Sequence, residues 1–126
     1  MGNLDVKSQS ARVDLAELLS RLDNDHELLR DLVAIFKEDF PKLVEALQES
    51  VAHADMTRAR VASHTLKGML ANLAVTRAAA AAGRVEELAS GGGGAGASIQ
   101  EALAAFEVEV RGLLTEMETY VTEVQS

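Results

Sequence analysis

Apolar residues recur along most of the chain at spacings of three and four, which is the period of an amphipathic α-helix. The longest stripe extends from Leu28 to Val51. Another, from Ile99 to Val124, alternates regularly between spacings of four and three and predicts one long helix at the seam of a bundle. Alternation typical of strands is scarce, and the chain contains a single proline. The pattern therefore predicts an all-α protein.

Residues that cap or begin helices precede the stripes, and they place the helix starts. The predicted starts are Asp14, Asn24 (in the capping box Asn-Asp-His-Glu), Asp55, Thr76 and Ser98. Because each helix has one apolar face, the set predicts an antiparallel up-down four-helix bundle with a short additional N-terminal helix. Residues 1–12 lack periodicity and are predicted to form a flexible tail or linker, which leaves residues 13–126 as one bundle domain.

The predicted helix that ends near Leu73 has a polar side of unusual composition. Its apolar arc is formed by Ala62, Leu66, Met69 and Leu73. The opposite side, predicted to face solvent, contains Arg60, His64, Lys67, Gly68 and Ala71. An interior helix glycine costs about 1 kcal/mol relative to alanine. The predicted use of Gly68 is therefore to clear space beside His64.

An exposed imidazole is a nucleophile at neutral pH and can carry a phosphoryl group on nitrogen. Lys67, three residues after His64, lies close enough on a helix surface to offer a point charge to phosphoryl oxygens. The alternative is an ordinary solvated helix face on which His64 is only polar. The glycine beside the His64–Lys67 pair weakens that alternative.

The run His-Thr-Leu-Lys-Gly at residues 64–68, followed by Ala-Asn-Leu at 71–73, resembles the signature of histidine-containing phosphotransfer (HPt) domains of bacterial-type multistep phosphorelays. The segments at 36–43 and 85–88 fit the same family, and the resemblance covers roughly residues 14 to 124. The chain departs from the family at Ala74, where a glycine often follows the motif helix, and in the glycine run near residue 91.

The resemblance implies a phosphorelay intermediate, in which His64 accepts a phosphoryl group on Nε2 from a receiver aspartate and passes it to another response regulator receiver. It also implies that Lys67 steadies the phosphoryl group, that Gly68 gives steric clearance, and that Arg60, Val61 and Ala71 form docking surface. The expected partners are receiver domains and/or a hybrid sensor histidine kinase. Mg²⁺ is expected from the receiver, and this chain is expected to bind no cofactor itself.

Such a protein is a phosphohistidine carrier rather than a self-sufficient enzyme, and no autokinase activity is expected. His26 precedes Glu27, as in the phosphoacceptor box of sensor kinases, but the rest of that box is missing. His26 is thus predicted to be a solvated first-turn residue. His53 lies near a helix end, where a cation suits the helix dipole.

A helical bundle of this kind has two rival functions. One is a helical-bundle interaction module that docks a receiver or kinase without accepting phosphate. The presence of both His64 and Lys67 argues against it, because such a module could dispense with either residue. The other is a metal-binding bundle, which is disfavoured because no glutamate lies three residues before any histidine.

Composition and charge argue against several other classes of protein. The 126-residue chain has no cysteine and a net charge of −8, which argues against disulfides and against nucleic acid as the main partner. No apolar run approaches the roughly 18 residues of a membrane span, and the N-terminus lacks a signal-peptide pattern. We therefore expect a cytoplasmic monomer without membrane insertion.

Overall fold

The computed structural model describes residues 12–91 and 98–125, and within these ranges all regular structure is helical. The helices are α2 (Leu15–Arg21), α3 (His26–Ala52), α4 (Met56–Asn72), α5 (Thr76–Ala89), α6 (Ile99–Val110) and α7 (Leu113–Gln125). The predicted all-α class is confirmed.

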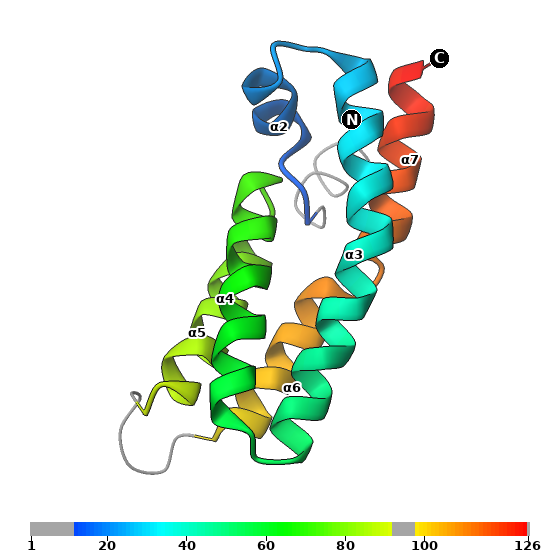
Figure 1. Ribbon diagram of the computed structural model, residues 1–126. Coiled ribbons are helices and arrows are strands. Elements are labelled where there is room, and N and C mark those ends of the chain that lie inside the picture. The colour runs from blue at the N-terminus through cyan, green and yellow to red at the C-terminus, as the bar shows by residue number, and fades with distance from the viewer. Residues whose placement is uncertain (1–11, 92–97, 126) are drawn as a thin grey trace.

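The helices form an antiparallel bundle, in which α3, α4 and α5 alternate in direction (Figure 1). α4 packs against both α3 and α5, α5 packs against α6, and α3 packs against α7. α6 and α7 follow one another in the same direction and together take the place of the last helix of the predicted bundle (Figure 1). The short helix α2 lies beside the end of α4, as the additional N-terminal helix that the sequence predicts (Figure 1).

The prediction of one continuous helix from Ile99 to Val124 is wrong. Arg111 has an extended backbone and Gly112 has φ +78°, a conformation that ends an α-helix and that glycine adopts readily. The apolar spacing nevertheless continues across the break, so Phe106 before it and Leu113 after it are both fully buried. Periodicity alone could not reveal the interruption because the break preserves the inward-facing side.

Helix N-termini are closed mostly by side chains. Asp14, Asp55 and Ser98 each accept a hydrogen bond from the backbone N–H three residues later, as predicted. The predicted cap of α3 is wrong by one residue, because Asp25 accepts from the Leu28 N–H and Asn24 adopts φ +59° in the preceding turn. Thr76 is the first residue of α5, as predicted.

The C-terminus of α4 is closed by its own turn and by the N-terminal segment. Ala74 adopts φ +60°, and the Val75 N–H donates to the Leu70 carbonyl over 2.9 Å. In a Schellman motif this is the hydrogen bond that spans more residues. The turn thus forms without the glycine that the family often has. Asp14 N–H donates to the Ala74 carbonyl, and Arg21 Nη1 donates to the Ala71 carbonyl over 2.8 Å. These bonds attach α2 to the end of α4.

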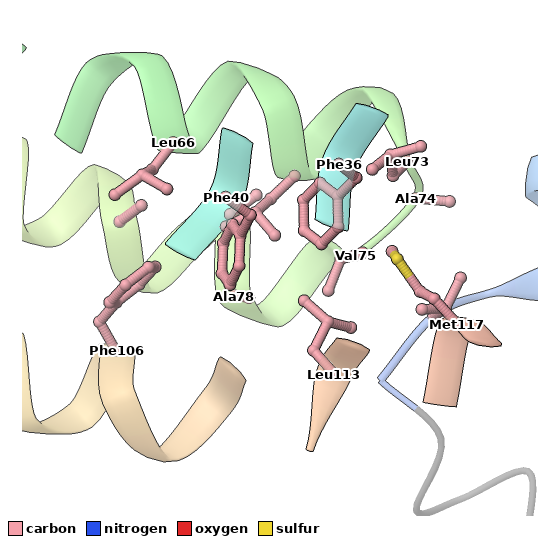
Figure 2. Close-up of a cluster of buried hydrophobic side chains, with 14 of the residues drawn as sticks. Phe36, Phe40, Leu66, Leu73, Ala74, Val75, Ala78, Phe106, Leu113 and Met117 are labelled. Carbon is pink, nitrogen blue, oxygen red and sulfur yellow. The ribbon is translucent and has the colours of Figure 1, made fainter. Parts of the chain in front are cut away.

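The core lies between the helices and sets the orientation of α4. Phe36 and Phe40 of α3 stack with ring centroids 4.5 Å apart, near Leu66 of α4 and Phe106 of α6 (Figure 2). Leu66 is fully buried. Because residues that are two apart on a helix point in very different directions, burial of Leu66 turns His64 away from the core.

The carboxylate of Glu116 on α7 binds the start of the described chain. It accepts hydrogen bonds from the backbone N–H groups of Arg12 and Val13 and from the hydroxyl of Tyr120. Arg12 Nε also donates to the Glu109 carbonyl near the end of α6. Of the predicted tail, residues 1–11 lie outside the described ranges, whereas Arg12 is held against the bundle.

The pKa of Tyr120 depends on this arrangement and can be measured. Burial, with a further contribution from the charge of Glu116 and its hydrogen bond, raises the pKa of the Tyr120 phenol from its ordinary 10.0 to about 12. Tyr120 is the single tyrosine of a chain without tryptophan, so an ultraviolet titration observes it alone. We expect ionisation near pH 12 while circular dichroism still shows folded helices. The unfolded chain releases this proton first, so stability should fall as pH rises from the ordinary tyrosine pKa towards 12.

A Glu116→Gln variant provides the control for this titration. Removal of the charge should lower the pKa of Tyr120 part of the way towards its ordinary value, because burial remains. Ionisation of the folded wild type at the ordinary pKa would contradict the placement of Tyr120.

Candidate functional site

His64 lies in the middle of α4 on the side that faces solvent. Its side chain is 67% exposed, while Ser63 and Leu66 on the same helix are completely buried. The Ser63 hydroxyl donates to the Ala59 carbonyl over 2.7 Å, so this buried polar group is satisfied within the helix. The predicted exposure of His64 is confirmed.

A carboxylate from the neighbouring helix connects His64 and Lys67. Oε2 of Glu86, on α5, lies 2.9 Å from Nδ1 of His64. Oε1 of the same carboxylate lies 2.7 Å from Nζ of Lys67. The Glu86 side chain is 21% exposed, against 42% for Lys67. One partly covered carboxylate therefore holds two of the predicted site side chains of α4.

The contact with Glu86 determines which nitrogen of His64 is available. A carboxylate can only accept hydrogen bonds, so Nδ1 must carry the proton that bonds to Oε2. In the neutral ring Nε2 then keeps its lone pair. Nε2 has no hydrogen-bonding partner in the part of the chain that the structure describes. The arrangement presents an oriented nucleophilic nitrogen to solvent.

The same contacts keep Glu86 charged. The hydrogen bond from Lys67 is the main cause that lowers the pKa of the Glu86 carboxyl, with a smaller contribution from His64 against the opposing effect of burial. Glu86 is therefore an anion at neutral pH. A carboxylate bonded to Nδ1 holds the imidazole in one tautomer and one orientation, as in catalytic triads.

Two glycines lie near these side chains and differ in their surroundings. A methyl group placed on Gly68 would meet no atom within 4 Å among the described residues, so no helix packs on this position. A methyl group on Gly83 of α5 would lie 3.2 Å from Cδ of Lys67. Gly68 is thus an exposed gap beside His64, whereas Gly83 borders the stem of Lys67.

The other predicted site residues lie on the same helix. Arg60, Val61 and Ala71 are all exposed, and the exposed fraction of Val61 is 53% although its side chain is large and apolar. His26 and His53 lie elsewhere, on α3 and at its C-terminal end. His53 Nδ1 contacts the Glu49 carbonyl of its own helix at 2.8 Å, and neither histidine is paired with an acidic side chain within the described ranges.

The described residues contain neither a metal-binding cluster nor a membrane-spanning helix. No group of three or more histidine, cysteine, aspartate or glutamate side chains there could hold a metal ion. No described helix is both long enough and apolar enough to cross a membrane.

Glu86 was not among the predicted site residues. The signal available was an acidic side chain directly after the buried Val85, at the edge of the apolar face of α5. The chain has 20 acidic residues, and Glu86 lies 22 positions from His64. Only the packing of α5 on α4 identifies which carboxylate reaches the histidine.

Comparison with known proteins adds one finding. A protein-family model described as the Hpt domain matches residues 31–125. No curated protein and no solved structure matches the chain.

The open surroundings of Gly68 predict the sign of a stability change. Gly68→Ala should raise the free energy of unfolding by up to about 1 kcal/mol, because alanine favours the helix and its methyl group would meet no neighbour. Urea denaturation followed by circular dichroism measures this change. A lower unfolding midpoint for the variant would mean that Gly68 serves helix packing instead.

Proposed function

The chain belongs to the Hpt domain family, and from this premise we propose that His64 is the phosphoryl-accepting histidine of a phosphorelay. The family implies histidine phosphotransfer and interaction with response regulator receivers. The observation that carries the assignment to His64 is its hydrogen bond to Glu86, which leaves Nε2 of this exposed side chain without a partner among the described residues. His26 and His53 have no such carboxylate within the same ranges.

In the proposed reaction the Nε2 lone pair attacks the phosphorus of an aspartyl phosphate on the receiver. The new N–P bond forms as the P–O bond to the aspartyl carboxyl breaks, and the aspartate leaves as a carboxylate. The imidazole keeps its Nδ1 proton and gains positive charge. The Glu86 carboxylate, 2.9 Å from Nδ1, stabilises that charge and holds the ring in position. Attack by a second receiver's aspartate on phosphohistidine reverses these steps.

Lys67 contributes in two ways in this scheme. Its ammonium holds Oε1 of Glu86 in the free protein, which fixes the carboxylate for His64. Its stem is flexible and partly exposed, so the ammonium can also reach phosphoryl oxygens one turn away on the helix surface. Exposed ion pairs contribute little to stability, so these contacts serve the site more than the fold.

The receiver must approach closely for in-line attack, and the surface around His64 suits that approach. Gly68 leaves open space beside the ring, and Val61 offers apolar surface one turn before it. Arg60 and Ala71 extend the proposed docking surface on α4. In this scheme the receiver supplies the Mg²⁺ that neutralises phosphoryl charge.

The proposal is tested with a panel of phosphorylated receiver domains. Wild type should take up label that is labile to acid and stable to alkali, as expected of phosphohistidine. His64→Gln should take up none and keep its helix content, because an exposed side chain contributes little to stability. His26→Gln and His53→Gln are matched controls and should label like wild type.

Two results of this experiment would contradict the proposal. Equal labelling of His64→Gln and wild type would exclude His64 as the acceptor. Stable binding of a receiver without any labelling would identify an interaction module that accepts no phosphate.

If Gly68 provides space for the receiver, a larger side chain at this position should leave stability unchanged or higher but should lower the rate of phosphate transfer. Gly68→Gln should fold at least as well as wild type, because glutamine favours a helix more than glycine. It should transfer phosphate much more slowly, because its side chain projects beside the His64 ring. Gly68→Ala should lie between the two in rate. Normal transfer by a well-folded Gly68→Gln protein would show that the receiver does not need this space.

A further inference from the structure

Gly83 is an unexpected residue in its helix. It follows five consecutive alanines, Ala78 to Ala82, in a segment that otherwise favours helix formation. It has ordinary negative φ, so its backbone does not require glycine. A glycine in the interior of a regular helix weakens that helix relative to alanine, which raises the question of what it provides here.

Its surroundings in the fold answer that question. A methyl group on Gly83 would have one neighbouring atom within 4 Å among the described residues, Cδ of Lys67 at 3.2 Å. No backbone of α4 comes that close, so the packing of α4 on α5 does not require glycine. The absence of a side chain at Gly83 leaves room for the aliphatic stem of Lys67.

The ammonium group of Lys67 contacts Glu86, which lies one turn after Gly83 on α5. Gly83 and Glu86 are three residues apart and therefore adjacent on the helix surface. The Lys67 stem passes Gly83, and its Nζ lies 2.7 Å from Oε1 of Glu86. Oε2 of that carboxylate contacts His64. Gly83 thus borders the route by which Lys67 reaches the carboxylate that orients the histidine.

We propose that Gly83 is a positioning residue for phosphoryl transfer, which lets the Lys67 stem lie against α5 and so fixes Glu86 between Lys67 and His64. This inference rests on the proposed function of His64. Gly83 itself touches no reacting atom and acts through Lys67. Its role differs from that of Gly68, which keeps space free for the partner.

The first test observes the Glu86 carboxyl by ¹³C NMR and needs no phosphate transfer. Displacement of Lys67 removes the main cause that lowers the pKa of Glu86, so that pKa should rise towards its ordinary value. The rise should be small in Gly83→Ala, where the lysine stem need shift only slightly, and larger in Gly83→Leu. Gly68→Ala is the matched control for this titration and should leave it unchanged, because its methyl group meets nothing.

The second test measures transfer from a phosphorylated receiver. Gly83→Leu should slow it by up to about fivefold, the rate equivalent of losing an exposed ion pair. In a Lys67→Ala background, the further change Gly83→Leu should alter neither the rate nor the Glu86 titration. Ala80→Leu, at an exposed position one turn earlier on α5, is the control for added bulk and should transfer like wild type.

The two proposals fail in different ways. An unchanged Glu86 titration in folded Gly83→Leu and Gly83→Ala would overturn the role of Gly83, even if His64 is labelled normally. An effect of Gly83→Leu that persists undiminished without Lys67 would overturn it too, because it would act by another route. Failure of wild type to accept phosphate would instead refute the proposed function, while the titration would still report on the contact between Gly83 and Lys67.

Discussion

The close packing of α5 against α4 is the constraint on which the site depends. α4 and α5 pack on one another, and both bury small side chains, among them Ala59 and Ala62 on α4 and Ala78 and Ala82 on α5. Small residues allow helix axes to approach closely. This approach brings Glu86 within hydrogen-bonding distance of His64 although the two are 22 positions apart in the chain.

Stability and the proposed chemistry are assigned to opposite sides of α4. Its inner side contributes Leu66 and Leu70, which are completely buried, and the core fixes how the helix is rotated. Its outer side carries His64 and Lys67, which are partly or largely exposed and contribute little to folding. Exchanges on the outer side are therefore expected to change the proposed phosphoryl transfer while the bundle remains folded.

The ends of the helices depend on contacts between segments that are distant in sequence. Glu116 on α7 accepts hydrogen bonds from the backbone of Arg12 and Val13, and Arg21 on α2 donates to the last turn of α4. The N-terminal segment thus spans the bundle from α7 to the helix that carries His64. It also satisfies carbonyls at the end of α4, where Ala74 adopts a left-handed φ, through Arg21 and the Asp14 N–H.

The amino-acid sequence by itself determined the helical class, most helix starts and the outward position of His64, because helical periodicity and capping are local properties of the chain. It also placed Lys67 and Gly68 beside the histidine through their spacing along one helix. Only the tertiary structure decided that Glu86 pairs with His64, that Gly83 borders Lys67 and that the last helix is broken at Gly112. The first two depend on the register between α4 and α5, which no local pattern fixes. The third leaves the apolar period unchanged, and its local signal is Gly112 itself, which periodicity does not register.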